Sequence, residues 1–190
     1  MAHEGYQPAG KSPMHSKNAP DDMGAVCGRS IAFITALAKS PDGSDPDIAA
    51  AIAAAKGARV AAAMVLSTSE FAEVAAEATR NAGKKGNTLV QALEYDPAAA
   101  VSLTREAGGF ELFGLPYGLL VTMRAVADSL LDDYEGVLVM DAAQSDVTAN
   151  SLYELCLDAS EHPEAETVAL REQYKQQSPC WINRAFLDRL

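Results

Sequence analysis

Short apolar runs of strand length alternate with alanine-rich stretches of helical length along most of this chain. The clearest runs are Ile31–Leu37, Arg59–Leu66, Thr88–Leu93 and Gly136–Met140, each bounded by turn residues. Runs of this length without regular polar residues are typical of strands covered on both faces, as in parallel sheets. The alternation therefore predicts right-handed βαβ units and an α/β fold, in which these four runs are the central strands of a mostly parallel sheet between helices.

Capping and turn residues predict where the intervening helices begin and end. The first helices are expected from Asp45 or Asp47 to Lys56, from a cap at Ser67, Thr68 or Ser69 over Glu70–Ala82, and from Asp96–Pro97 to Glu106. Later helices are expected over Pro116–Leu131, from Thr148 or Asn150 to Ser160, and over Asn183–Leu190. Shorter strands are expected at Glu166–Leu170 and Cys180–Ile182.

The first 28 residues differ from the rest of the chain. They contain proline, glycine, lysine and histidine without a helical or strand period, which predicts a flexible N-terminal arm and a candidate surface for a protein partner. The remaining residues, 29–190, are a suitable length for one domain with one sheet.

Charge and cysteine content narrow the partners and the compartment. A net charge of −11 opposes binding to nucleic acid or to an anionic membrane, although a small phosphate-bearing ligand is still compatible with it. The apolar runs are shorter than the roughly 20 residues needed to cross a bilayer, and no signal peptide is recognisable. The three cysteines lack the spacing of a metal or redox motif. We therefore expect reduced thiols and a cytoplasmic location.

Candidate ligand-binding residues follow the predicted strands. Ligands of parallel sheets gather at the carboxyl ends of the strands, so the loops after Leu37, Leu66, Leu93 and Met140 are the places to search. Asp141 directly follows its strand, where a carboxylate can hold a divalent cation or, alternatively, serve as a loop or cap residue. Lys39 and Ser40 can contact phosphate from the first loop, or form only a solvated turn before Pro-Asp-Gly.

Three segments in the C-terminal half, taken together, resemble a known family. They are Gly118–Ala125, Gly136–Asp141 followed by Asp146–Thr148, and Gln177–Ile182 followed by Arg184–Leu187. In this order they are similar to motifs of the MobA-like nucleotidyltransferases, especially the molybdenum-cofactor cytidylyltransferase branch. The resemblance implies a Rossmann-like, nucleotide-diphospho-sugar transferase-like fold of three α/β/α layers.

The resemblance also implies a function and site residues. Gly118 and Thr122 match the family's nucleotide-contacting G-x-x-x-S pattern, although glycine in a loop and threonine inside a helix would explain them equally. Asp141 matches the aspartate that binds the divalent metal, so Mg²⁺ is the implied cofactor. The implied activity is transfer of a nucleotidyl group from a nucleoside triphosphate to a phosphate-bearing acceptor, as in molybdopterin cytosine or guanine dinucleotide formation.

The family's N-terminal signature, L-A-A-G-x-S-x-R-M-G-x-x-K, has no intact copy. One candidate, Thr35–Gly43, follows a strand but has Ala38 in place of a glycine and Asp42 near the expected arginine. The other, Ala9–Lys17, is a better letter match without room for a full preceding strand. The catalytic residues are therefore unassigned. An active transferase, an inactive accessory protein that binds nucleotide or a protein partner, and an unrelated α/β domain all stay open.

Overall fold

A computed structural model describes residues 26–83, 86–144, 146–169 and 179–190. Most of the predicted arm, the candidate loop Ala9–Lys17 and the start of the third family-like segment lie outside the described residues. Val26 and Cys27, which the sequence places in the arm, are helical, and Cys27 is fully buried.

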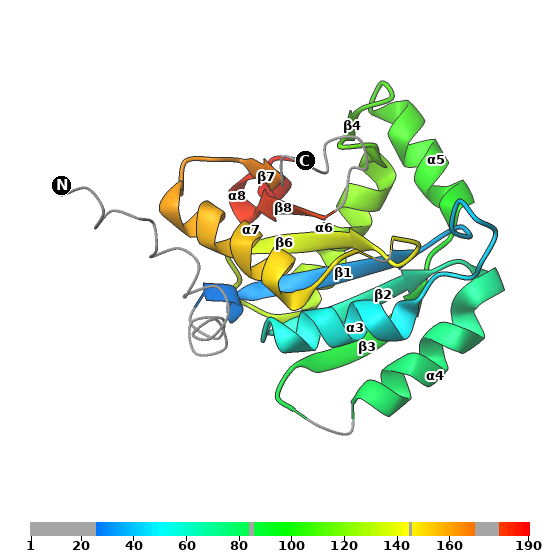
Figure 1. Cartoon of the computed structure of the whole chain (residues 1–190). Coiled ribbons are helices and arrows are strands. Elements are labelled where there is room, and N and C mark those ends of the chain that lie inside the picture. Colours follow the sequence, from blue (N-terminus) through cyan, green and yellow to red (C-terminus); the bar gives the residue numbers. More distant parts are fainter. Residues whose placement is uncertain (1–25, 84–85, 145, 170–178) are drawn as a thin grey trace, which may run out of the picture.

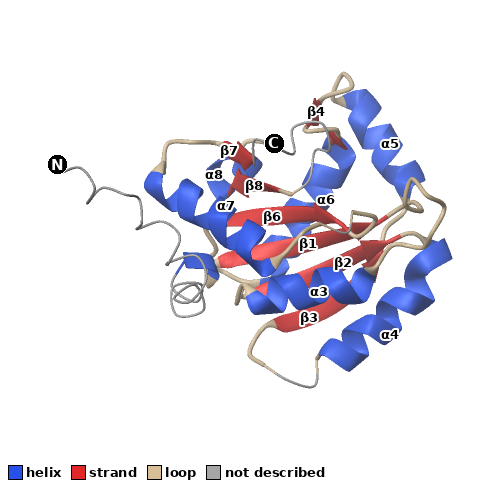
Figure 2. Cartoon of the chain, in the orientation of Figure 1, coloured by secondary structure: helices blue, strands red, loops and turns tan. Residues whose placement is uncertain are grey.

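A six-stranded, mostly parallel sheet forms the centre of the fold (Figure 2). Its order is β3 (Leu89–Glu94), β2 (Ala62–Ser67), β1 (Ser30–Ala36), β6 (Gly136–Asp141), β8 (Cys180–Asn183) and β7 (Thr167–Ala169). Strands β1, β2, β3 and β6 are parallel, and β8 is antiparallel to both of its neighbours. The predicted α/β class and mostly parallel sheet are confirmed.

Helices cover both faces of this sheet, which makes three layers. Figure 1 shows α3 (Ile48–Gly57), α4 (Ala72–Ala82) and α7 (Ala149–Glu161) in front of the strands. The opposite face packs against α5 (Pro97–Glu106), α6 (Tyr117–Leu130) and α8 (Arg184–Asp188). The longest described helix, α6, has 14 residues, whereas a bilayer span needs about 20.

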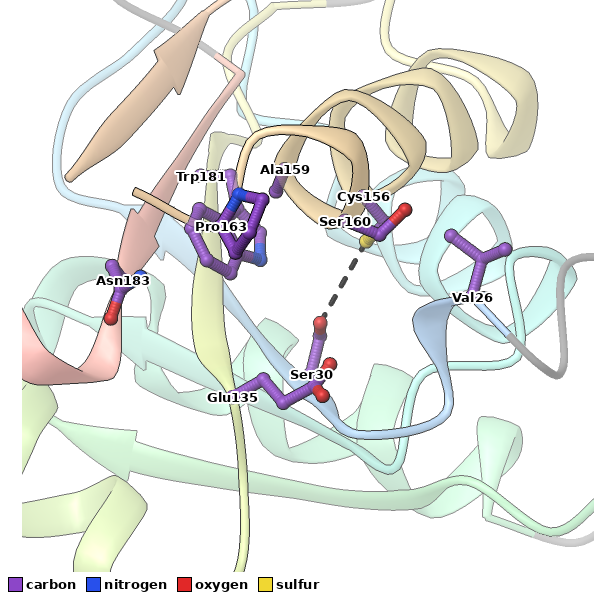
Figure 3. Close-up of a pocket in the computed structure, with 9 residues that line it drawn as sticks. All are labelled: Val26, Ser30, Glu135, Cys156, Ala159, Ser160, Pro163, Trp181 and Asn183. Carbon is purple, nitrogen blue, oxygen red and sulfur yellow. Dashed lines mark hydrogen bonds between the residues drawn. The ribbon is translucent and has the colours of Figure 1, made fainter. Parts of the chain in front are cut away.

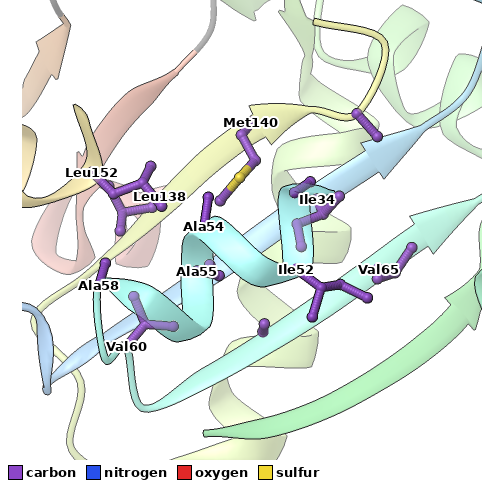
Figure 4. Packing of buried hydrophobic residues seen from close by; sticks show 14 of the residues in the cluster. Ile34, Ile52, Ala54, Ala55, Ala58, Val60, Val65, Leu138, Met140 and Leu152 are labelled. Atoms are coloured by element: carbon purple, nitrogen blue, oxygen red, sulfur yellow. The ribbon is translucent and has the colours of Figure 1, made fainter. Parts of the chain in front are cut away.

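Alternate side chains of the central strands supply two hydrophobic cores. Ile34 and Met140 point toward α3 and α7 (Figure 4), whereas Ile31 and Phe33 pack toward α6. All residues of β1 are buried, so this strand is apolar at almost every position rather than at every second one. Burial on both faces explains why these strands read as continuous apolar runs in the sequence.

Side-chain caps begin four of the described helices, including α8, where Asn183 accepts a hydrogen bond from Ala185 N. Asp47 accepts a hydrogen bond from Ala50 N and Asp96 accepts one from Ala98 N, while Thr148 forms a capping box with Ser151. Asp47 and Thr148 were each one of two predicted alternatives. The predicted cap of the second helix at Ser67, Thr68 or Ser69 is wrong. The 3₁₀ turn Ser69–Phe71 leads into α4, whose N-cap is Phe71, and neither Thr68 nor Phe71 makes a side-chain capping bond.

Two features differ from the expected arrangement. Strand β3 forms at the predicted place but lies at the sheet edge rather than the centre, and its Leu89 and Leu93 are 45% and 41% exposed. A short hairpin, β4 (Glu111–Leu112) and β5 (Leu115–Pro116), connects α5 to α6. Strands of two residues leave no readable period, and the turn between them places Phe113 at positive φ, where glycine or asparagine is the usual signal.

Candidate functional site

The loops after β1 and β6 meet at the carboxyl edge of the sheet. The chain crosses from β1 to β2 in one direction and later enters β6 on the other side of β1, so these two strands form the topological switch point. Ser40 Oγ donates to Ala143 O at 3.0 Å, and Asp47 N donates to Ala142 O at 2.8 Å. These bonds hold the two loops together where ligands of such sheets bind.

An open cavity of about 690 Å³ lies between the loops. Residues from Ser40 to Asp47 form one wall, and Ala142 and Ala143 form the other. Of the predicted site residues, Ser40 lines this cavity directly, while Lys39 and Asp141 immediately precede its two walls. The structure thus brings Lys39, Ser40 and Asp141 to one edge of the sheet.

Asp141 is the last residue of β6 and is half-buried. Its Oδ1 atom accepts a hydrogen bond from Ala143 N at 2.9 Å. Burial raises the pKa of this carboxyl above its usual value, and the hydrogen bond from Ala143 partly opposes that rise. A carboxylate at a partly desolvated strand end is the type of oxygen donor that Mg²⁺ and other hard cations prefer.

The loop after β1 carries more negative than positive charge. Lys39 is exposed and pairs with Asp45, with 3.7 Å between Nζ and Oδ1. Asp42 accepts hydrogen bonds from both Ser44 Oγ and Ser44 N, which hold its pKa below the usual value. With Asp47 also in this loop, the single lysine is outnumbered by aspartates, so a phosphate would bind here only with a cation.

Gly118 and Thr122 lie in the contact between α5 and α6. A Cβ atom at Gly118 would come within 2.2 Å of Ala100 O, so only glycine allows the helices to approach this closely. Gly118 N donates to Thr104 Oγ1 at 2.9 Å, and Thr122 Oγ1 donates to Gly118 O at 2.9 Å. These groups are engaged in packing, and neither residue lines the cavity between the loops.

The sequence did not reveal a second, apolar pocket at the same edge. This pocket, of about 620 Å³, is lined by Leu37 and Tyr95 at two strand ends and by residues of α5 and α6 such as Ala100 and Leu119. Leu37 begins the loop that also forms the first cavity. The walls of the apolar pocket come from three separate parts of the chain. In the sequence, the only local sign of this pocket was the Gly108–Gly109 break that lines it.

A divalent cation at this edge would have few protein ligands. Within the described ranges, no three histidine, cysteine, aspartate or glutamate side chains are grouped as a metal cage. Mg²⁺ is commonly held by one or two carboxylates together with water and substrate phosphates. Asp141 is a single carboxylate of the kind that such a cation uses.

Comparisons with known proteins give weak likenesses. No protein-family model matches the chain, and no curated protein matches its sequence at a significant level. A 4-diphosphocytidyl-2C-methyl-D-erythritol synthase structure from Anaerococcus prevotii has a TM-score of 0.48 and 12% identity, covering 92% of this chain and 78% of that one. Rv0371c from Mycobacterium tuberculosis has a TM-score of 0.46 and 14% identity, with coverages of 86% and 75%. A manganese complex of Rv0371c has a TM-score of 0.42 and 15% identity, with coverages of 85% and 75%. Likenesses this distant assign no activity to the present chain.

Proposed function

We propose that the carboxyl edge of the sheet binds a nucleoside triphosphate together with Mg²⁺, and that the protein is a nucleotidyltransferase of the MobA-like type. The observation that carries this proposal is the meeting of Asp141 with the loop after β1 at the switch point between β1 and β6, held by the bond from Ser40 to Ala143. An acid at this position can hold a cation against phosphates that lie across the strand ends.

The two cavities at this edge suit the two ends of a nucleotide. The phosphates would occupy the cavity beside Ser40 and Asp141, and the base would occupy the apolar pocket beside Leu37, Tyr95 and Leu119. Pockets for small molecules commonly combine an apolar wall for a ring system with a few polar groups that fix orientation. The loop after β1 contributes to both cavities and would therefore lie along the nucleotide.

The acidic loop makes the cation a requirement for binding. Asp42, Asp45 and Asp47 would repel a bare triphosphate, and Lys39 is already paired with Asp45. A bound divalent cation would neutralise charge on the phosphates and polarise the phosphorus–oxygen bond that breaks. Binding of the triphosphate should consequently depend steeply on Mg²⁺.

The acceptor is assigned only by the sequence resemblance. In that proposal, a phosphate group of a molybdopterin-type molecule attacks the α-phosphate of CTP or GTP, and pyrophosphate leaves. Asp42 lies in the segment where the related signature carries an arginine, so transfer should be slow. The same substitution, together with the pairing of Lys39, favours a second candidate function, namely an accessory protein that binds nucleotide without turning it over.

Isothermal titration with CTP and GTP, with Mg²⁺ and then with a chelator, tests the binding site. We expect binding only with Mg²⁺ and a loss of affinity of at least about tenfold in Asp141→Asn, which corresponds to about 1.4 kcal/mol. Asp146→Asn is the matched control because Asp146 is an exposed acid in the following segment. The absence of nucleotide binding, or equal affinity in Asp141→Asn, would overturn the proposed site.

A pyrophosphate-release assay then separates the two candidate functions. Release that requires a phosphate-monoester acceptor would support a transferase. Binding without release would support the accessory protein.

A further inference from the structure

A separate pocket lies at the amino edge of the sheet, away from the candidate nucleotide site. It has a volume of about 310 Å³ and is lined by Ser30 at the start of β1, Glu135 before β6, and Cys156 and Ser160 of α7 (Figure 3). The Trp181 ring forms another part of its wall. Solutes as small as hydrogen peroxide fit such a pocket, and it leads to the sulfur of Cys156.

Two cysteines from distant parts of the sequence belong to one buried cluster beside this pocket. Cys27 lies three residues before β1 begins, and Cys156 lies in α7 on the side that packs against the sheet. Each thiol shifts the pKa of the other, and both side chains are at least 97% buried in the same cluster. Ser30 Oγ lies 3.7 Å from Cys156 Sγ on the pocket side. The pair is thus shielded from bulk solvent except through the pocket.

The three thiols of the chain differ in their ionisation. The hydrogen bond from Cys27 lowers the pKa of Cys156, Ser30 adds to this effect, and burial and Glu135 oppose it. The pKa of Cys27 is raised, first by its bond to Cys156 and then by burial. Burial alone raises the pKa of Cys180 to about 12, and Cys180 lies in the other hydrophobic core. Cys156 is therefore the thiol that ionises first, which makes it the nucleophile of the pair.

We propose that Cys156 and Cys27 form a peroxide-reactive thiol pair that closes into an intramolecular disulfide. The proposal rests on three geometric features: the two thiols belong to one buried cluster, the pocket opens onto Cys156, and the hydroxyl of Ser30 lies beside the Cys156 sulfur. It is independent of the nucleotide site at the opposite edge.

The oxidant in this reaction is hydrogen peroxide, and the reaction balances in two steps. In the first, the Cys156 thiolate attacks one peroxide oxygen, a sulfur–oxygen bond forms, the oxygen–oxygen bond breaks, and the departing hydroxide takes up a proton to become water. In the second, the Cys27 sulfur attacks the sulfenic acid at Cys156, the sulfur–sulfur bond forms, and the hydroxyl leaves with the Cys27 proton as a second water. Two thiols are oxidised by two electrons, and one peroxide is reduced to two waters.

The test is treatment of the full folded chain with hydrogen peroxide, followed by intact mass spectrometry without reductant and peptide mapping. We expect the natural chain to lose two of its three free thiols and about 2 Da, with Cys27 and Cys156 joined in one peptide pair. Cys180→Ser is the matched control and should form the same bond. Dithiothreitol should restore the original mass in both proteins.

Two variants separate the roles of the pair. Cys27→Ser should stop at the sulfenic acid, with a gain of about 16 Da that dimedone traps at Cys156. Cys156→Ser should show neither change at the same peroxide dose. Circular dichroism before and after treatment establishes that each protein stays folded during the reaction.

Several outcomes would overturn the proposal. Retention of all three thiols in the folded natural chain, at a dose that oxidises them in urea, would show that the pocket does not admit the oxidant. A bond that includes Cys180, a bond between two chains, or oxidation that occurs only after unfolding would exclude the Cys27–Cys156 pair.

Discussion

The two edges of the central sheet use their polar groups differently. At the carboxyl edge, Asp47, Asp96 and Thr148 cap the helices that begin there, with hydrogen bonds of 3.0–3.1 Å to backbone N–H groups. At the amino edge, Arg29 pairs with Asp133 at 2.7 Å and with Glu135 at 3.2 Å. Acids at the carboxyl edge of an α/β sheet therefore need not indicate a ligand, because helix N-termini gather there and require acceptors.

Asp141 is different from the capping residues of the same edge. It ends a strand rather than beginning a helix, and its bond from Ala143 N lies within the loop that follows β6. Burial raises the pKa of Asp141, so keeping its carboxylate ionised costs free energy. Ionisable groups with shifted pKa values are more frequent at functional sites than elsewhere. The comparison between capping acids and Asp141 thus separates structural from candidate functional residues.

The largest expected effect concerns the packing of α6 at the carboxyl edge. Gly118→Ala should lower the free energy of unfolding by about 3 kcal/mol, because its Cβ would meet backbone atoms of Ala100 that cannot rotate away. Urea denaturation measures the loss. Gly83→Ala, where a Cβ would lie 3.3 Å from Thr79 O, should change stability by less than about 1 kcal/mol. A stable Gly118→Ala protein that fails to bind nucleotide would instead place Gly118 in the ligand site.

Removing the N-terminal cap of α7, at the same edge, should cause a smaller loss of unfolding free energy. Thr148→Ala should cost about 1 kcal/mol of unfolding free energy, since the N–H of Ser151 loses its acceptor and the capping box with Ser151 is broken. Thermal and urea unfolding check this value. Thr148→Ser keeps a hydroxyl and should retain most of the stability. Equal losses in both variants would mean that the hydroxyl is not the group that matters.

The charge of the loop after β1 should affect nucleotide affinity modestly. Asp42→Asn keeps an acceptor for the bonds from Ser44 but removes a negative charge, so Mg²⁺–CTP or Mg²⁺–GTP affinity should rise about threefold. Asp42→Arg should raise it further at low salt. Titration calorimetry of the two variants provides the comparison. Unchanged affinity in both would place the bound phosphates out of reach of Asp42.

The smallest change in unfolding free energy is expected from removing the ion pairs of Arg29 at the amino edge. Arg29→Gln should change the free energy of unfolding by less than about 0.5 kcal/mol, because the Arg29, Asp133 and Glu135 side chains are all more than half exposed. Urea denaturation at low and high salt measures the change. A loss larger than that of Thr148→Ala would reverse the comparison between the two edges.

The sequence predicted the central part of the fold because its strands are buried on both faces. Ile31–Leu37 and Gly136–Met140 are apolar at almost every position for that reason, and both are central strands of the sheet. The edge position of β3 was not predicted, because strand order depends on tertiary packing. The hairpin between α5 and α6 was missed because its strands have two residues each.

The candidate site was predictable only in part. The position of Asp141, Lys39 and Ser40 at one edge of the sheet was predictable, because loops after parallel strands share that edge. The packing role of Gly118 was not distinguishable in the sequence, since a glycine near a helix start serves a ligand or a neighbouring helix equally well. The apolar pocket was missed because Leu37, Tyr95 and Leu119 come together only in the folded chain.

Hydrogen exchange with mass spectrometry is the most direct measurement of whether the carboxyl edge is the ligand site. The exchange of the full chain would be followed with and without saturating Mg²⁺–CTP or Mg²⁺–GTP. We predict slower exchange in residues 38–47 and 141–144, which form the loops after β1 and β6, and no change in residues 26–30 or 156–162 at the amino edge. Protection of the amino edge alone, or no protection of either loop at saturation, would contradict the assignment of the site to the switch point between β1 and β6.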